Sequence, residues 1–382
     1  MLSNNIYINS FLLVSLFFLM LLTLIIPNIG DWNTYACAGT ALMLLFNTIL
    51  SCNYKISRFS SFMLVAMVLH FFLTPDKVTA VFLMVSNLLL FEVMKQYIFS
   101  YKIVIYPFLC IALLAFILTL PQLLHVVFES RITRSALYEG FFTNSNSTSA
   151  YYLVVIMCTL LFVKTPYLKT IFLAISLLVI VATGCRSGFL TLFTTSLFYF
   201  LLKSKFHRFT IYVFFFLLFA FTYYLVFIEG TSAISFDYMG KGGDSAGRSA
   251  QIIYIINKYS VNLFGYGKNI INADSVKNQG FAVHNFWICS LYSSGLIILS
   301  GYTYFICKLF YSVKSHVAKA FLLSLNLAFF FEPGVCYYIS FSNIFPIVVV
   351  LLQEGQEQVF QRQICECCVD MDTELVDGNT IL

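Results

Sequence analysis

Charged residues are scarce in this sequence. Only 10% of its 382 residues are Asp, Glu, Lys or Arg, whereas about 25% are charged in a typical soluble domain. Hydrophobic residues reach 60%, above the roughly 45–50% of such domains. The composition therefore excludes a water-soluble globule. The formal charge of +5 is small and is spread over polar breaks, which argues against a nucleic-acid-binding surface.

Two catalytic motifs are absent from the chain. It contains neither a Walker loop nor a His-Glu-x-x-His sequence, so ATP-dependent phosphoryl transfer and metalloprotease chemistry have no support. Most of the eleven cysteines fall in apolar runs, where Cys behaves as a small hydrophobe. Cys365, Cys367 and Cys368 lie close together, but no His or second Cys pair accompanies them. We expect reduced thiols there, with no metal site and no cofactor.

Long hydrophobic runs alternate with short polar breaks along the chain. A transmembrane helix needs about 20 apolar residues, so the runs predict an all-α, polytopic integral membrane protein with about twelve transmembrane helices. We expect residues 1–352 to form a single membrane-embedded bundle. The predicted spans are 8–27, 34–50, 59–73, 78–94, 103–120, 147–163, 168–183, 188–202, 209–228, 283–306, 317–331 and 336–352.

Basic residues gather in every second break between these spans. Since cytoplasmic loops carry an excess of Lys and Arg, these breaks and both termini are predicted to be cytoplasmic. Two long segments, 121–146 and 229–282, then face outward. The second is expected to form a partly helical cap, with Ile252, Ile255, Ile256 and Tyr259 lying against the bilayer or the bundle. The acidic tail, residues 353–382, is predicted to be cytoplasmic and disordered.

Four polar clusters lie on the predicted outer side, each before or at the start of a helix. They occupy residues 140–147, 183–188, 243–249 and 283–285. A helix start offers unpaired N–H donors and about half a positive charge, so acidic groups are its usual neighbours. Arg186 and Arg248 instead place cations there, at a cost of about 0.3–1 kcal/mol each. A bound phosphate or diphosphate would offset this cost, so the pattern indicates an outward-facing anion site without a metal.

Each of these residues also has a plainer interpretation. Arg186 would snorkel to outer lipid headgroups, and Arg248 would be a solvated loop residue. His284 would be an interfacial histidine. Asn144 and Asn146 would only cap the following helix. Arg131 and Arg134 would be surface charges, or would meet a second lipid phosphate.

The clusters and the glycines that follow them have a definite order. Gly140 is followed by an Asn-x-Asn at Asn144 and Asn146, and Thr183 stands three residues before Arg186. Further on come Gly247-Arg248, Gly265-Tyr266-Gly267, His284-Asn285 and Gly295. In order, spacing and membrane side, residues 135–305 resemble the O-antigen ligase and polymerase superfamily of bacterial envelope glycosyltransferases.

The resemblance implies sugar transfer at the periplasmic face of the bacterial inner membrane. The donor would be an oligosaccharide on undecaprenyl diphosphate, held among membrane lipids. Arg186 and Arg248 would bind the diphosphate, and His284 would be the general base in a metal-independent, inverting transfer. The substrate-binding residues would be Asn144, Asn146, Gly247, Gly265, Gly267, Asn285, Arg131 and Arg134.

Three activities fit this interpretation. A polymerase extends surface polysaccharide on the lipid carrier, with a chain-length regulator protein as its partner. A ligase transfers finished polymer to lipid A core. The Phe- and Tyr-rich composition and the few outer basic residues favour the polymerase, whose acceptor is a single repeat unit. A repeat-unit flippase is the third candidate, but the chain lacks a long cytoplasmic loop between two six-span halves.

Overall fold

The computed structural model describes somewhat more than half of the chain. Of the described residues, 86% are helical and none lies in a β-strand, which confirms the all-α class. The described residues are 11, 12, 15, 19, 39, 40, 43, 46, 58–74, 101–129, 138–140, 145–224, 248–267, 270, 271, 274, 275, 277, 285–328, 349, 350 and 353.

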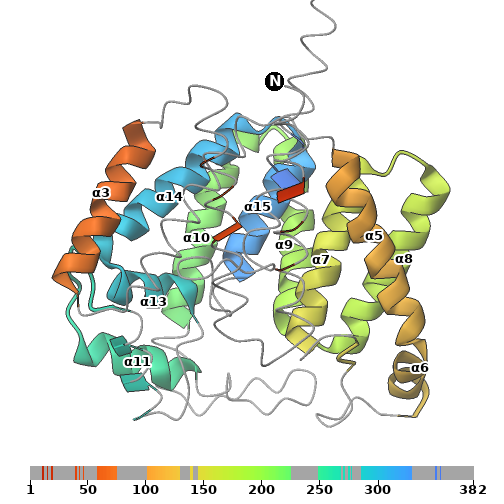
Figure 1. Cartoon of the computed structure of the whole chain (residues 1–382), viewed down its shortest axis with the longest axis horizontal. Helices are drawn as coiled ribbons and strands as arrows, with labels where there is room; N and C mark the ends of the chain where they lie inside the picture. The colour runs from red at the N-terminus through yellow and green to blue at the C-terminus, as the bar shows by residue number, and fades with distance from the viewer. Residues whose placement is uncertain are drawn as a thin grey trace, which may run out of the picture.

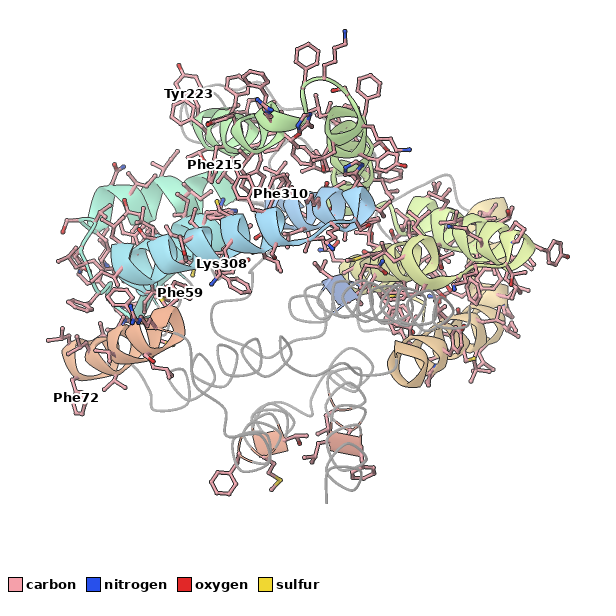
Figure 2. All side chains as sticks on the ribbon, turned by 90° about the horizontal axis from the view of Figure 1, so that it is seen from above. Phe59, Phe72, Phe215, Tyr223, Lys308 and Phe310 are labelled. Carbon is pink, nitrogen blue, oxygen red and sulfur yellow. The ribbon has the colours of Figure 1, made fainter. Side chains whose placement is uncertain are left out.

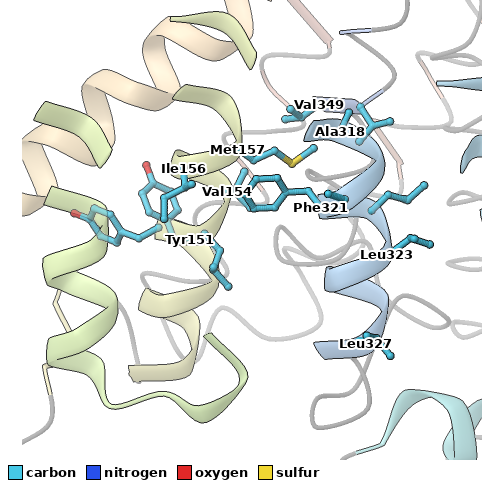
Figure 3. Close-up of a cluster of buried hydrophobic side chains, with 14 of the residues drawn as sticks. Tyr151, Val154, Ile156, Met157, Ala318, Phe321, Leu323, Leu327 and Val349 are labelled. Carbon is cyan, nitrogen blue, oxygen red and sulfur yellow. The ribbon is translucent and has the colours of Figure 1, made fainter. Parts of the chain in front are cut away.

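The helix α7 (Ser145–Phe162) is the centre of the bundle. Every residue from 151 to 159 is buried, as expected for a helix that is apolar on all sides. It packs against α8 (Pro166–Thr183), α9 (Arg186–Lys203) and α15 (His316–Ala328). Figure 3 shows Phe321 of α15 projecting towards Val154 and Met157 of α7, so the core lies between these two helices.

A bent helix flanks this centre. The helices α5 (Tyr101–Leu118) and α6 (Leu120–Glu129) meet at Thr119 and differ in direction by 58°. The expectation that an outer loop begins at residue 121 is wrong, because the chain stays helical to Glu129. Tyr151 and Tyr152 of α7 donate hydrogen bonds to carbonyl oxygens of α5, which ties the bent helix to the core.

The remaining described helices lie on the other side of the core (Figure 1). They are α3 (Arg58–Leu73), the short 3-10 helix η1 (His207–Phe209), α10 (Thr210–Tyr223), α11 (Arg248–Lys258), α13 (Phe286–Ser293) and α14 (Gly295–Ser312). The predicted single span 283–306 is thus two helices, because Gly295 at φ +83° interrupts it. The predicted outer segment 229–282 does contain a helix, α11, which confirms that it is partly helical.

Turns and helix starts are sorted between the two ends of the bundle. The turns at 163–165, 204–206 and 313–315 lie at the upper end in Figure 1, and α11 lies at the lower end, where α7 and α9 begin. Lys164, Lys205 and Lys314 belong to the upper turns. This sorting agrees with the predicted alternation of the loops, and the cytoplasmic assignment of the upper end remains a prediction.

Several helices have the length and surface of membrane spans. Among the described residues, α8 and α14 are long and apolar enough to cross a membrane, and α5 with α6 makes a third if the bent pair is one span. Large apolar side chains project outward, including Phe72, which is 75% exposed, and Tyr223 (Figure 2). A lipid environment favours such a surface, so the chain is a membrane protein. The predicted spans 8–27, 34–50, 78–94 and 336–352 lie wholly or largely outside the described residues, and the number twelve stays a prediction.

Two backbone segments pair where α13 meets α14. The N–H groups of Tyr266 and Gly267 donate to the carbonyls of Tyr292 and Ser293, over 2.8 and 2.9 Å. In return, the first-turn N–H groups of α14 at 296 and 297 donate to the carbonyls at 262 and 263, over 3.0 and 3.2 Å. We call this pairing of 262–267 with 292–297 the backbone splice. It joins residues 262–267, which belong to the predicted outer segment, to α13 and α14.

The splice is also tied to α3. Nδ1 of the buried His70 donates to the carbonyl of Phe264 over 2.5 Å. Helix α14 also contacts α3 directly, because Gly301 of α14 lies close to Met63 of α3. Helix α3, residues 262–267 and α14 therefore meet at one place.

Replacing Gly295 tests the splice. A Cβ at this position would overlap the backbone of Leu263 and Gly265, and its φ of +83° disfavours any L side chain. Gly295→Ala should therefore lower the free energy of unfolding in detergent by on the order of 3 kcal/mol.

Gly301→Ala is the matched control, since its Cβ would meet only the flexible Met63 side chain. Its cost should stay below about 1.5 kcal/mol. Thermal unfolding in detergent measures both variants. An equal loss of unfolding free energy in the two would contradict the splice.

Candidate functional site

All four predicted clusters lead into helices. The structure begins α7 at Ser145, α9 at Arg186 and α11 at Arg248, and it places Asn285 at the N-cap of α13. Both arginines expected at helix starts are therefore the first residues of their helices. These backbone positions agree with the prediction that both residues stand at helix starts, while the anion site itself stays a prediction.

The first two clusters lie beside each other. The N–H of Tyr138 donates to the carbonyl of Ala182 at the end of α8, over 3.3 Å. The hydroxyl of Thr148, in the first turns of α7, donates to the carbonyl of Glu139. Gly188 in the first turn of α9 faces Ser149 of α7 so closely that a Cβ would overlap the Ser149 hydroxyl. The starts of α7 and α9 and the end of α8 thus lie together.

A tight turn joins α8 to α9. Helix α8 ends at Gly184, whose φ of 56° permits the left-handed cap and whose N–H donates to the carbonyl of Val181 over 3.1 Å. Cys185 then caps α9 without a side-chain hydrogen bond to its first turn. The N–H donors at this helix start are suited to an anion.

The start of α13 carries a buried side-chain amide, Asn285, whose oxygen is hydrogen-bonded and whose nitrogen is not, within the described residues. The Asn285 side-chain oxygen accepts from the N–H of Ile288 over 2.9 Å, which is a typical N-cap. Asn285 is only 1% exposed, and its Nδ2 has no hydrogen-bond partner among the described residues. A buried donor without an acceptor is unfavourable and often marks a ligand position.

Helix α15 fixes the orientation of α13. Nε1 of Trp287 donates to the carbonyl of Asn326 over 3.0 Å, and the Asn326 side-chain oxygen accepts from the Tyr302 hydroxyl over 2.6 Å. The rings of Phe286, Trp287 and Tyr302 contact one another, with centroids 4.9–5.9 Å apart. Because α15 packs along α9, the start of α13 is braced by the helix that also braces α9.

Helix α11 is held on two sides. Ile252 and Ile255 are buried, so the apolar face packs on the protein, as expected. At the other end of α11, the Asp274 carboxylate accepts from Lys258 Nζ over 2.5 Å and from the hydroxyls of Tyr254 and Tyr259 over 2.9 and 3.0 Å. We call these four residues the clasp. It was not predicted: Tyr254 and Lys258 share a helix face, but nothing local points to Asp274.

The clasp keeps its charges over a wide pH range. Hydrogen bonding from Lys258 lowers the pKa of Asp274, and the same bond raises the pKa of Lys258. Burial and hydrogen bonding to Asp274 raise the pKa of Tyr259 to about 12. Folding lowers the pKa of Asp274, so the ionised carboxylate stabilises the folded protein. This contribution is fully present at a pH above the ordinary Asp pKa of about 3.9, and it is lost only as the pH falls through the lowered pKa.

Several predicted site residues lie outside the described part of the chain. These are His284, Asn144, Gly247, Arg131 and Arg134, together with the side chains of Arg186 and Arg248. Asn146 is described and lies half-buried in the first turn of α7. Gly265 and Gly267, expected to bind substrate, adopt φ of 73° and 91° and form the backbone splice. Their structural role accounts for the glycines there.

Other sequence patterns also fall outside the described residues. Residues 243–247 have the sequence Gly-x-Ser-x-Gly. In hydrolases the Ser of this motif is the nucleophile and stands on a strand-to-helix turn. Asp370 and Asp372 form an Asp-x-Asp pair in the tail, on the predicted cytoplasmic side, with Cys365, Cys367 and Cys368 nearby. Within the described part of the chain, no three His, Cys, Asp or Glu side chains are placed to hold a metal ion.

No known family model matches the sequence, and no curated protein is significantly similar to it.

The contact between α7 and α9 is testable by a size exchange. Gly188→Ala would force its methyl against the buried Ser149 hydroxyl and should cost about 1–3 kcal/mol of unfolding free energy. Ser149→Ala removes that hydroxyl, which has no hydrogen-bond partner in the described structure, and should be nearly neutral.

The double variant should regain most of the stability lost in Gly188→Ala. Melting temperatures of the purified protein in detergent measure the coupling. Simple additivity of the two single changes would show that these helix starts do not meet as described.

Proposed function

We propose that this protein is a membrane glycosyltransferase that polymerises undecaprenyl-diphosphate-linked oligosaccharide repeat units. The reaction takes place at the periplasmic face of the bacterial inner membrane, and the product is O-antigen or a related surface polysaccharide. The proposal rests on the ordered resemblance of residues 135–305 to the O-antigen ligase and polymerase superfamily. It also rests on the helix starts that carry the motifs.

One observation carries the proposal at the level of the site. The Nδ2 group of Asn285 is a buried hydrogen-bond donor that lacks an acceptor within the described structure. It stands at a helix start, directly after His284. An acceptor-rich ligand such as a saccharide or a phosphate would satisfy it. The braced position of α13 suits a group that must meet its ligand in a fixed geometry.

The proposed chemistry is a single displacement. A hydroxyl oxygen of the acceptor sugar attacks the anomeric carbon of the donor while His284 takes the hydroxyl proton. The bond from that carbon to the diphosphate breaks, and the lipid diphosphate leaves with the electron pair. Arg186 and Arg248, with the N–H groups of α9 and α11, stabilise the growing negative charge. Attack from the face opposite the leaving group inverts the anomeric centre.

The arginines supply in this proposal the positive charge that a metal ion often supplies. A guanidinium presents two parallel N–H donors to phosphate oxygens and stays protonated. The transfer should therefore proceed in the presence of a chelator.

The backbone splice favours transfer over transport. Many transporters hold ions or substrates at the free backbone groups of a broken membrane helix. Here α13 and α14 form such a break, but residues 262–267 already pair with the carbonyls at 292 and 293 and the N–H groups at 296 and 297. The N–H groups at 296 and 297 are thus used, and each of the two carbonyls has one lone pair engaged, so this break offers fewer free groups to a transported ion.

Alanine variants test the assigned roles. Arg186→Ala and Arg248→Ala should each lower the rate of transfer by about 10²–10³-fold, because each removes a stabiliser of the leaving diphosphate. His284→Ala should lower it by about 10²–10⁴-fold. Transfer between lipid-linked repeat units in reconstituted vesicles measures the rates.

Arg208→Ala is the matched control, since Arg208 is exposed in η1, away from the start of α9. It should keep full activity. Full activity in all three test variants would refute the proposed site.

Two substitutions of Asn285 separate folding from ligand binding. Asn285→Ser keeps an N-cap oxygen but removes the amide donor, so stability should hold while transfer falls at least tenfold. Asn285→Ala also removes the cap and should lower the free energy of unfolding by about 1 kcal/mol. Should the Ser variant transfer at the normal rate, Asn285 acts only as a helix cap.

Product analysis distinguishes the polymerase from the ligase. With lipid-linked repeat units as the sole substrate, a polymerase yields a ladder of longer saccharides, with or without chelator. A protein that leaves these units unchanged but joins preformed polymer to lipid A core is a ligase. Loss of activity with chelator would refute metal independence.

A further inference from the structure

The clasp joins two parts of the outer segment that are distant in sequence. Lys258 Nζ lies 2.5 Å from both carboxylate oxygens of Asp274, and it also donates to the Tyr254 hydroxyl over 2.9 Å. Asp274 accepts hydrogen bonds from Tyr254, Lys258 and Tyr259, so much of its capacity as an acceptor is used within the protein. The Asp274 carboxylate therefore holds the end of α11 in place rather than forming a vacant binding site.

The clasp continues into the backbone splice. The ring of Tyr259 packs on the ring of Tyr266, with centroids 4.9 Å apart, and the Tyr266 hydroxyl shares a hydrogen bond of 2.9 Å with Ser260. The backbone N–H of Tyr266 then donates to the carbonyl of Tyr292 in α13. A continuous set of contacts therefore runs from the end of α11 to α13.

This set of contacts has a consequence for Arg248, which is the first residue of α11. An 11-residue helix is about 16 Å long and stiff over that length. Fixing its last turn and its buried face at Ile252 and Ile255 therefore also sets the position of its first residue. Without the clasp, the apolar face alone would hold α11.

We propose that Lys258 and Asp274 are positioning residues, which hold α11 so that Arg248 keeps a fixed place relative to α13. This inference rests on the proposed function only for what Arg248 binds. The positioning itself concerns α11 and can be measured without turnover. The clasp lies on the surface, where Lys258 is 43% exposed, so its effect on global stability is small and its effect is local.

Two measurements on each variant test the inference. Hydrogen exchange of the backbone amides at 248–258 reports whether α11 is held. Steady-state transfer with an undecaprenyl-diphosphate-linked repeat unit reports KM and kcat separately. Lys258→Ala should speed exchange in α11 at least fivefold and raise the KM for the donor severalfold, with kcat within about twofold. A loosened helix leaves fewer molecules ready to bind, and this raises the apparent dissociation constant.

Rescue separates positioning from a general loss of structure. Lys258→Arg keeps the ion pair and should restore both measurements. The exchanged pair Lys258→Asp with Asp274→Lys should recover more than either single change. Lys277→Ala removes an exposed cation of the same segment and is the control that should change nothing.

The outcomes are distinct. Normal exchange in Lys258→Ala would overturn the clasp as a fastening. Faster exchange with an unchanged KM would overturn its role in positioning Arg248. If instead Arg248→Ala keeps full transfer, the proposed function of Arg248 fails, while the exchange data still decide whether the clasp holds α11.

Discussion

Close backbone pairing at the splice is the constraint that holds residues 262–267, α13 and α14 together. Gly265 and Gly295 approach so closely that no side chain fits between their segments. In an apolar environment, every unpaired backbone group costs several kcal/mol. The break between α13 and α14 exposes such groups, and the segment 262–267 pairs with them. Residues 262–267 are therefore part of the helix bundle rather than an attachment to it.

The sequence predicted helices and their starts better than it predicted contacts. Hydrophobic runs located α7, α8, α9 and α15 to within about three residues, because a continuous apolar surface and a polar start are local signals. The break at Gly295 was missed since an apolar run on both sides masks a change of φ at one residue. The extension of α5 into α6 was missed for the opposite reason, because Pro121, Gln122 and His125 interrupt the apolar run although the chain stays helical.

Contacts between distant residues had no local signal. Asp274 lies sixteen residues after Lys258, and the orphan amide of Asn285 shows only once the cap is built. The place of Gly265 and Gly267 in the splice was not visible either, because a motif shows where glycine occurs but not why, and their binding of substrate stays a prediction. In contrast, Arg186 and Arg248 were placed correctly at helix starts, since a cation before an apolar run is visible in the sequence.

The setting of Trp287 has a practical consequence. The chain contains two tryptophans, and this one directly follows the Asn285–Phe286 start of α13, where its indole bonds to Asn326 and contacts Tyr302. Its fluorescence depends on that hydrogen bond and on its dry surroundings. With the other tryptophan replaced, the wavelength of maximum fluorescence of the protein reports whether the first turn of α13 packs against α15.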